Sequence, residues 1–452
     1  MIELPAERMA AVMGADLHAR GPGGHPEKAV IDSREISGGE LFFGLTGGAD
    51  DGGRFAKVAL EAGAWGVVVE PSRAAELDGL DGWVFTSEDP LRSLQMLARA
   101  WRRELGATVI GITGSVGKTS VKDITAAILP GEVHASAENF NTEIGLPLTI
   151  LEAPAGTGIL VLEMAMRGSG QIAELAAIAE PDVGVITNVG PVHVELLGSI
   201  EAVAAAKAEL IGGLKPDGIL IVPVEAGHLE PHLDSHAGLV RFGPGGDVRS
   251  LSSQVSPTHT MARISTSFGT EEFVFPFTES HNLHNALAAV AVGISAGARP
   301  SELSARAGRV SFSKLRGEHH DLGAEGLLIN DCYNANPLSM RAALDYLSSL
   351  DRPQKVAVLG QMAELGPDAL RFHEEIGDYA RESGIDTMVS VGREADGYGA
   401  EVRVDTPSEA ADWIRENLEP RGAVLVKGSR SAGLEAVQES LEAAELTHGP
   451  VN

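Results

Sequence analysis

The stretch TVIGITGSVGKTSVKDITAAIL, residues 108–129, decides the fold of the middle of this chain. An apolar run leads into a glycine-rich turn, and a segment with helical periodicity leaves it, which predicts a strand, a phosphate-binding loop and a helix. Gly117, Lys118 and Thr119 match the end of the G-x-x-x-x-G-K-[ST] motif. Ile112 stands where that motif begins with glycine, so the loop departs from the usual spelling.

The physical requirements of phosphate binding are still met in this turn. Backbone N–H groups at a helix start, together with the positive end of the helix dipole, favour an anion. Lys118 can reach the terminal phosphates of a nucleotide, and Thr119 can ligate Mg²⁺. The alternative is a glycine-rich turn that carries a lysine by chance. Because kinases, motor ATPases, GTPases and ligases all use such loops, the loop alone does not name the reaction.

The composition limits the classes of partner. The chain has 452 residues, which corresponds to about three domains. Its 63 acidic and 35 basic residues give a formal net charge of −28, which disfavours nucleic acid and anionic membranes as partners. An anionic substrate would need local cations or metal ions to overcome this field.

Cysteine usage and the apolar runs indicate a soluble cytoplasmic protein. Cys332 is the only cysteine, so no disulfide can form within the chain. The N-terminal residues carry acidic side chains early and lack the pattern of a signal peptide. No apolar run approaches the roughly 18 residues that a membrane helix needs, so we expect no membrane insertion.

Alternating strand and helix patterns predict an α/β fold in three parts. A central P-loop ATPase-like parallel sheet is expected from the apolar runs at 108–113, 158–164, 183–187 and 218–223. The last third repeats the pattern at 326–331, 355–360, 387–392 and 423–428, which predicts a Rossmann-like doubly wound domain. A smaller α/β domain precedes them, and a helix at 91–105 connects it to the centre. The predicted domains are 1–103, 104–312 and 313–452, with a linker and hinge at 313–323.

Three further side chains are candidates for chemistry. Glu163 ends a predicted strand, where parallel sheets bind ligands, and could hold a metal ion; the alternative is a solvated acid. His193 follows the next strand in the same way, although a lone histidine is more often structural. Lys207 lies in the alanine-rich helix AAAKAEL and, from the helix alone, reads as a surface lysine. A desolvated lysine near metal ions could instead take up CO₂ as a carbamate.

Together these motifs resemble the Mur ligase family, which builds the peptidoglycan precursor in the cytoplasm. The family spells its loop T-G-x-x-G-K-[ST], which accounts for the departure at Ile112. The resemblance of the central part rests on TGSVGKTS (113–120), ENFNTEIGLPLTIL (138–151), ITNVGPVHVELLGS (186–199), AKAEL (206–210) and HNLHNALAA (281–289). Outside it, DSREISGGELFFGLTG (32–47) resembles the segment that binds the UDP-sugar. Three further segments resemble the C-terminal domain of the family: NDCYNANPLSMRAAL (330–344), VAVLGQMAELG (356–366) and VLVKGSRS (424–431).

The resemblance implies a role for each matching residue. ATP would be bound by Thr113, Gly114, Ser115, Val116, Gly117, Lys118, Thr119, Ser120, Asn282, Arg316 and Asp331. Two Mg²⁺ ions would be held by Thr119, Glu163, His193 and a carbamylated Lys207, and the catalytic residues would be Lys118, His193 and Lys207. The UDP-sugar would meet Ser33 and Arg34, and the incoming dipeptide would lie near Asn334, Asn336, Lys427 and Arg430.

The C-terminal segments and ENFNTEIGLP most resemble the branch that ligates D-alanyl-D-alanine to UDP-N-acetylmuramoyl-tripeptide. This implies an ATP-dependent reaction through an acyl phosphate, by a monomer, in peptidoglycan synthesis. One alternative is another amide ligase of the superfamily, adding the third residue or of the folylpolyglutamate type. A second alternative is a nucleotide-dependent regulatory protein without ligation chemistry. The chain departs from the pattern at Arg167-Gly168, Pro223-Val224-Glu225 and Gln361, and no role is transferred to those positions.

Overall fold

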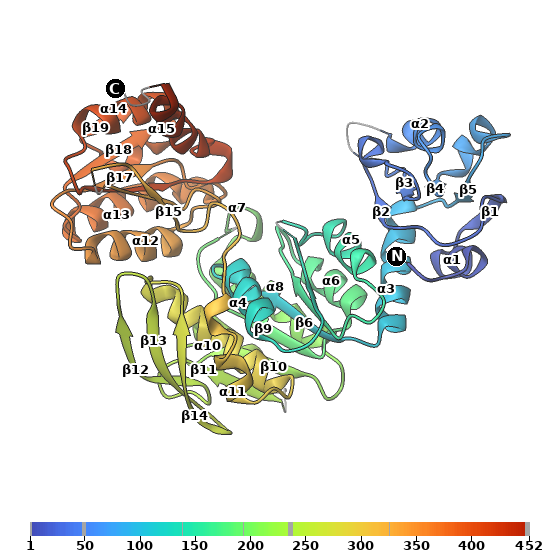
Figure 1. Cartoon of the computed structure of the whole chain (residues 1–452), viewed down its shortest axis with the longest axis horizontal. Coiled ribbons are helices and arrows are strands. Elements are labelled where there is room, and N and C mark those ends of the chain that lie inside the picture. Colours follow the sequence, from blue (N-terminus) through green and yellow to red (C-terminus); the bar gives the residue numbers. More distant parts are fainter. Residues whose placement is uncertain are drawn as a thin grey trace.

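A computed structural model describes residues 2–47, 51–137, 139–192, 194–233, 238–324 and 326–447. Three α/β units follow one another in chain order, with the N-terminal unit at one end of the molecule and the C-terminal unit at the other (Figure 1). The predicted α/β fold with three domains is confirmed. Among the described residues, no helix combines the length and the apolar character that a bilayer crossing requires.

The central unit is built on a six-stranded sheet in the order β11-β10-β9-β6-β8-β7, and all its neighbours are parallel. The four apolar runs predicted as strands are strands, and the two short edge strands β7 and β11 escaped prediction. Their bounds are β6 Thr108–Thr113, β7 Val133–Ala135, β8 Ile159–Glu163, β9 Val183–Ile186, β10 Ile219–Pro223 and β11 Leu239–Phe242.

Helices cover both faces of this sheet. One face packs on α4 (Lys118–Ile128) and α10 (Ser280–Ser295), and the other on α5 (Gly145–Glu152), α6 (Gln171–Ala179) and α8 (Ile200–Gly213). Val109 belongs to one of these cores and Ile110 to the other. A strand buried on both faces needs apolar residues at successive positions, which is why β6 reads as one apolar run.

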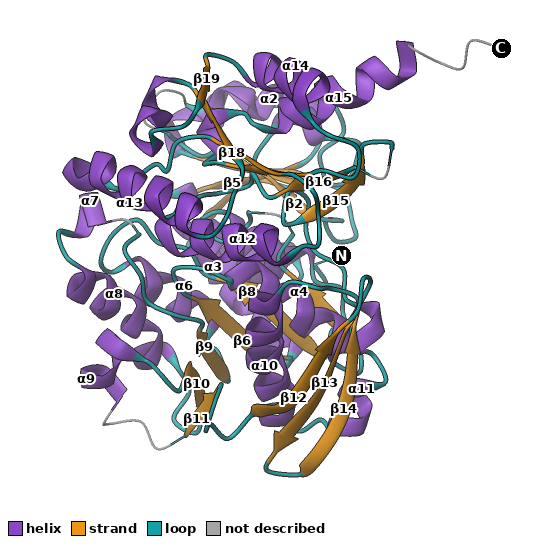
Figure 2. Cartoon of the chain, turned by 90° about the vertical axis from the view of Figure 1, so that its left-hand side faces the viewer, coloured by secondary structure: helices purple, strands orange, loops and turns teal. Residues whose placement is uncertain are grey.

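A three-stranded antiparallel sheet was not predicted. It comprises β12 (Arg249–Val255), β13 (Thr260–Thr266) and β14 (Gly269–Phe275) and lies beside α10 in Figure 2. Its inner face contributes Ile264 and Phe273 to the core around α10, whereas its outer face is more exposed and mixes polar side chains with apolar ones such as Val274. Alternate polar residues interrupt the apolar pattern along these strands, and a search for continuous runs passes over them.

The C-terminal unit is a six-stranded sheet in the order β15-β16-β20-β17-β18-β19. Only β15 is antiparallel to its neighbour. The predicted linker at 313–323 is therefore too long, because 318–321 already form strand β15 of this sheet. The bounds are β15 Glu318–Asp321, β16 Leu327–Asn330, β17 Lys355–Leu359, β18 Thr387–Val391, β19 Val402–Val404, β20 Ala423–Lys427, α12 Pro337–Ser349, α13 Ala369–Glu382, α14 Pro407–Asn417 and α15 Glu435–Thr447.

The N-terminal unit is a five-stranded sheet in the order β1-β5-β4-β3-β2. The predicted connecting helix is α3, and it packs on α1 of this unit and on α5 and α6 of the central unit. The predicted boundary between the N-terminal and central domains, at residues 103 and 104, falls inside α3 (Pro90–Leu105) and stays a prediction. The bounds are β1 Asp16–Ala19, β2 Ala29–Val30, β3 Leu41–Phe43, β4 Gly66–Val69, β5 Trp83–Thr86, α1 Ala6–Met13, α2 Ala56–Glu61 and α3 Pro90–Leu105.

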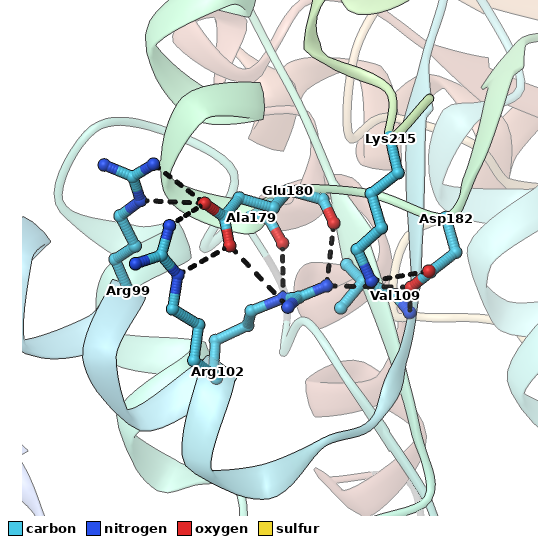
Figure 3. A network of polar contacts seen from close by, with 8 residues as sticks. Arg99, Arg102, Val109, Ala179, Glu180, Asp182 and Lys215 are labelled. Atoms are coloured by element: carbon cyan, nitrogen blue, oxygen red, sulfur yellow. Dashed lines mark hydrogen bonds and ion pairs between the residues drawn. The ribbon is translucent and has the colours of Figure 1, made fainter. Parts of the chain in front are cut away.

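A polar network fastens α3 to the central sheet (Figure 3). Glu180, which follows α6, accepts hydrogen bonds from Arg99 at 2.8 Å and from Arg103 at 2.9 Å. The buried Arg102 donates to the backbone carbonyls of Ala179 and Glu180, each at 2.8 Å. Two residues after Glu180, the Asp182 carboxylate accepts from the Val109 N–H at 2.8 Å and from Lys215 at 2.5 Å. The network thus joins α3 to the strand that leads into the phosphate loop.

We predict that Glu180→Gln lowers the free energy of unfolding by about 1–2 kcal/mol at pH 7, measured by urea denaturation. Hydrogen bonds from Arg103 and Arg99 lower the pKa of Glu180 from 4.5 to about 2. A lowered carboxyl pKa stabilises the fold above the unfolded value, so the deficit should shrink as the pH falls from 4.5 toward 2. Glu416→Gln, at an exposed position of α14, is the control, and an equal effect there would contradict the prediction.

Candidate active site

Two glycines shape the loop between β6 and α4. Gly114 has a φ of +148°, and a Cβ atom there would collide with the hydroxyl of Thr187. Gly117 has a φ of +83°, and its Cβ would lie 2.6 Å from Oδ1 of Asn285 on α10. Both positions therefore require glycine, for backbone conformation and for close approach.

The loop is held by the segment that follows β9. The N–H of Ser115 donates to the Asn188 carbonyl at 3.1 Å, and the N–H of Val116 donates to Asn188 Oδ1 at 2.9 Å. The Thr187 hydroxyl donates to the Val116 carbonyl at 2.5 Å. Lys118 folds back so that Nζ donates to the Gly114 carbonyl at 2.8 Å. The predicted strand, loop and helix are confirmed, and these hydrogen bonds fix the conformation of the loop.

An oxygen pair suited to Mg²⁺ lies at the start of α4. The Thr119 hydroxyl donates to Glu163 Oε2 at 2.8 Å, and Asn141 donates to Glu163 Oε1 at 2.9 Å. Mg²⁺ binds oxygen at about 2.0–2.1 Å in octahedral geometry, so two adjacent ligands are about 2.9 Å apart. The Thr119–Glu163 spacing fits such a pair. Within the described part of the chain, which does not include His193, no group of three His, Cys, Asp or Glu side chains could hold a metal ion.

Lys207 is buried in the interior and not at the surface. Its side chain is on α8 and only 1% of the residue is exposed, so the reading as a surface lysine is wrong. Burial, and next the positive charge of Lys118, lower the pKa of Lys207 well below its usual value. The neutral amine, which is the form that reacts with CO₂, is therefore more accessible than in an exposed lysine. Burial also lowers the pKa of Lys118, and the charge of Glu163 opposes that shift.

A cavity of about 1400 Å³ lies between the central and C-terminal units. Thr113, Gly114 and Lys207 are not part of its lining, and neither are Ser33 and Arg34 of the N-terminal unit. Arg34 is an exposed side chain paired with Asp32 at 2.5 Å. The cavity does bring together many predicted site residues: Ser115, Val116, Gly117, Lys118, Thr119, Ser120, Glu163, Asn282, Arg316, Asp331, Asn334, Asn336, Lys427 and Arg430.

Arg316, in the segment that leads into the C-terminal unit, contacts the end of the phosphate loop. Its terminal nitrogen donates to the Thr119 hydroxyl at 3.1 Å, and its guanidinium lies 4.2 Å from the ring centroid of Tyr333. Nε of Arg316 is buried without a hydrogen-bond partner. The cation therefore lies beside the phosphate loop, and part of its donor capacity is unused.

The remaining predicted residues on the C-terminal side have structural partners. Lys427 is buried and donates to Asp331 Oδ2 at 2.6 Å and to the Asn334 carbonyl at 3.0 Å, so it supports Asp331 from behind. Asn336 caps α12 by accepting from the Ser339 N–H at 3.0 Å. On the other wall, Asn282 donates to Glu279 at 3.3 Å.

Sequence reasoning missed four polar residues that shape the site. Asn141, Thr187, Asn188 and Asn285 fix Glu163 or the phosphate loop. Asn141 and Asn285 lie inside the quoted motifs ENFNTEIGLP and HNLHN, so their signal was present. Thr187 and Asn188 likewise lie inside the quoted motif ITNVGPVHVELLGS, and they follow β9 directly, at the sheet edge where ligands bind.

Comparison with known proteins decides the family. Residues 112–293 match the Mur ligase middle domain, and residues 316–430 match the Mur ligase glutamate ligase domain. The UDP-N-acetylmuramoyl-tripeptide–D-alanyl-D-alanine ligase of Bacillus subtilis is 35% identical over 434 residues, which cover 92% of this chain and 93% of the relative. The chain is a Mur ligase.

Solved structures are similar to this Mur ligase over nearly all of its length. MurF from Acinetobacter baumannii superposes with a TM-score of 0.88 at 27% identity, covering 97% of this chain and 98% of that one. MurF from Thermotoga maritima, solved in complex with ADP, superposes with a TM-score of 0.82 at 29% identity, covering 93% and 98%. All three units therefore share their arrangement with a Mur ligase of known structure.

We predict that Gly114→Ala weakens ATP binding by about tenfold or more, measured by calorimetry with a non-hydrolysable analogue. The added Cβ would displace Thr187 and open the loop. Gly156→Ala is the control, because its φ of +92° is also one that residues with a side chain rarely adopt, while its Cβ would meet nothing within 4 Å. Equal affinities for the two variants would contradict the account of the loop.

Proposed function

We propose that this Mur ligase joins D-alanyl-D-alanine to UDP-N-acetylmuramoyl-tripeptide and produces UDP-N-acetylmuramoyl-pentapeptide, ADP and phosphate through an acyl phosphate. The observation that carries the proposal is the 35% identity with a ligase of that name over 92% of the chain. A MurF neighbour solved with ADP supports ATP as the nucleotide. The cavity also supports the proposal, because its lining includes both the phosphate loop and Asp331 of the C-terminal unit.

The first chemical step brings two anions together. A substrate carboxylate must attack the γ-phosphate, and two unit charges 4 Å apart interact by about 4 kcal/mol at an effective dielectric constant near 20. Lys118, whose Nζ donates to the Gly114 carbonyl, and Arg316, which donates to the Thr119 hydroxyl, would supply opposing charge. They would also stabilise the charge that spreads over the transferring phosphoryl group. The surface charge of −28 does not prevent this, because the cavity carries its own cations.

Two Mg²⁺ ions are part of the proposal. When bound, they neutralise phosphate charge during transfer. Thr119 and Glu163 would hold one, and their 2.8 Å separation supports this. Lys207, as a carbamate, and His193 would hold the other; His193 lies outside the described residues. The burial of Lys207 beside the charge of Lys118 supports the carbamate, since it favours the neutral amine.

Closure of the C-terminal unit would shield the acyl phosphate from water. Ser313 is anchored to Asp123 of α4 at 2.8 Å, and β15 begins at Glu318, so the hinge would lie between them. In that interval Leu315 has a φ of +61° and Gly317 a φ of +67°. A non-glycine residue such as Leu315 is uncommon in the left-handed region, and such positions are concentrated at active sites and switch regions.

The rest of the proposal concerns partners and location. Ser33 and Arg34 of the N-terminal unit would contact the UDP-sugar, and Asn334, Asn336, Lys427 and Arg430 would lie near the dipeptide. We propose a cytoplasmic monomer that takes no nucleic acid and does not insert into membranes. The formal net charge of −28 supports the absence of nucleic acid and anionic membranes as partners.

Phosphate release from ATP, with each substrate omitted in turn, tests the proposed function. We expect full release only with UDP-N-acetylmuramoyl-tripeptide and D-alanyl-D-alanine both present. Turnover with a UDP-dipeptide and a single amino acid would favour the ligase that adds the third residue, and turnover with a folate and glutamate would favour the folylpolyglutamate type. ATP binding without release in any mixture would favour a regulatory protein.

We predict that Lys207→Ala lowers turnover by about a thousandfold or more, with partial rescue by short carboxylic acids that replace the carbamate. The matched control is Lys122→Ala, because Lys122 is also a buried lysine near this site but donates to the Ser136 carbonyl. Its loss should not be rescued by carboxylic acids. Normal turnover in Lys207→Ala would remove the carbamate from the proposal.

A further inference from the structure

A polar cluster joins the central unit to the C-terminal unit beside the cavity. Glu279 lies immediately before α10, and Nε2 of His319, on β15, is 3.3 Å from its Oε1. The same nitrogen lies 3.2 Å from the hydroxyl of Tyr346 on α12, which is 2.7 Å from the hydroxyl of Thr278. The rings of His319 and Tyr346 are stacked, with centroids 5.8 Å apart. The C-terminal unit therefore supplies part of the environment of Glu279.

The Glu279 carboxylate is buried, and its surroundings favour the ionised form. Burial raises the pKa of Glu279, but hydrogen bonds from His319 and from its own backbone N–H, with the charge of His319, hold the pKa below its usual value. An ionised carboxylate has no proton to donate, so each of its hydrogen bonds must come from a donor. Oε2 of Glu279 accepts from the Thr278 N–H at 3.1 Å and from Nδ2 of Asn282 at 3.3 Å.

This acceptor fixes the orientation of the Asn282 side-chain amide. The amide nitrogen must face Glu279, and the amide oxygen accepts from Nδ2 of Asn285 at 3.2 Å. An asparagine amide has two N–H groups and an oxygen with two lone pairs, so Asn282 keeps one donor and one acceptor for a ligand. Asn282 lines the cavity about one helical turn from Asn285, whose Oδ1 packs against Gly117 of the phosphate loop.

We propose that Glu279 is a positioning residue that makes this Mur ligase select adenine over hypoxanthine and guanine. The inference rests on the proposed function, in which ATP occupies the cavity and Asn282 contacts it. Adenine presents an amino donor at N6 beside the acceptors N1 and N7, and an asparagine amide pairs with such an edge. Hypoxanthine and guanine carry an acceptor at O6 beside a donor at N1, so they require the amide turned over. Turning it would set the Asn282 oxygen against the Glu279 carboxylate, with no proton between the two acceptors.

Titration calorimetry with ADP and with inosine diphosphate (IDP), whose bases differ only in this donor and acceptor pattern, tests the inference without turnover. We expect the wild-type enzyme to bind ADP about tenfold or more tightly than IDP. In Glu279→Gln the new amide can accept from Asn282 or donate to it, so the Asn282 amide can turn. The preference for ADP should then fall to within about twofold, and IDP should bind more tightly than it does to the wild type. Because damage to the fold cannot raise the affinity for IDP, an unchanged preference would overturn the inference.

Two neighbouring histidines of β15 provide matched variants. His319→Gln removes the charged partner of Glu279 and should lower the preference for ADP by about threefold. His320→Gln should leave it unchanged, because His320 contacts Gln438 at 3.2 Å and Glu442, both on α15. Equal preferences in these two variants would overturn the inference, and this comparison decides if Glu279→Gln does not fold. Wild-type enzyme that binds neither nucleotide would contradict the proposed function itself, whereas one that binds ADP and IDP equally would contradict this inference alone.

Discussion

The burial of Lys207 within the field of Lys118 is the constraint on which the rest of the site depends. Two positive charges in a medium of low dielectric constant repel each other and lose hydration, so one of them must become neutral or gain an anion. Burial, and next the charge of Lys118, favour the first outcome at Lys207, because both lower its pKa well below the usual value. An ATP phosphate at Lys118 and a carbamate at Lys207 would provide the second.

The surrounding structure holds the phosphate loop that carries Lys118 in place. Thr187 and Asn188 hold the phosphate loop, and α10 closes on Gly117 from the other side. Through Asp182 and Val109, the network around Glu180 ties the strand below the loop to α3. Catalytic groups that are held rigidly need no reorganisation during the reaction, which is the main source of electrostatic catalysis. The C-terminal unit then completes the site through Arg316.

Much of this architecture could be predicted because strands buried on both faces leave a continuous apolar signal. The strands β6, β8, β9 and β10 were found in this way. The sheet β12–β14 could not be found from apolar runs, because polar residues interrupt the apolar ones along its strands and its buried positions include Thr260. The strand EHHD of β15 has no apolar residue, and only its pairing with β16 defines it.

The site was predictable where a motif carries the chemistry and unpredictable where distant segments meet. Gly117, Lys118, Thr119 and Glu163 line one cavity as expected. The burial of Lys207 could not be read from its helix, because alanine occurs both in cores and on surfaces. Glu364 lies in a quoted motif, but its sequence context did not indicate its neighbours. Only the fold brings it near Arg167 and brings its loop against the loop after β20.

Carbon-13 NMR of the enzyme in ¹³C-labelled bicarbonate tests the central claim most directly. If the charge of Lys118 and burial keep Lys207 neutral, the wild-type protein will show a protein-bound carbamate signal that is absent from Lys207→Met, a variant that retains the apolar stem. Absence of the signal from the wild-type enzyme, or its survival in Lys207→Met, would contradict the account.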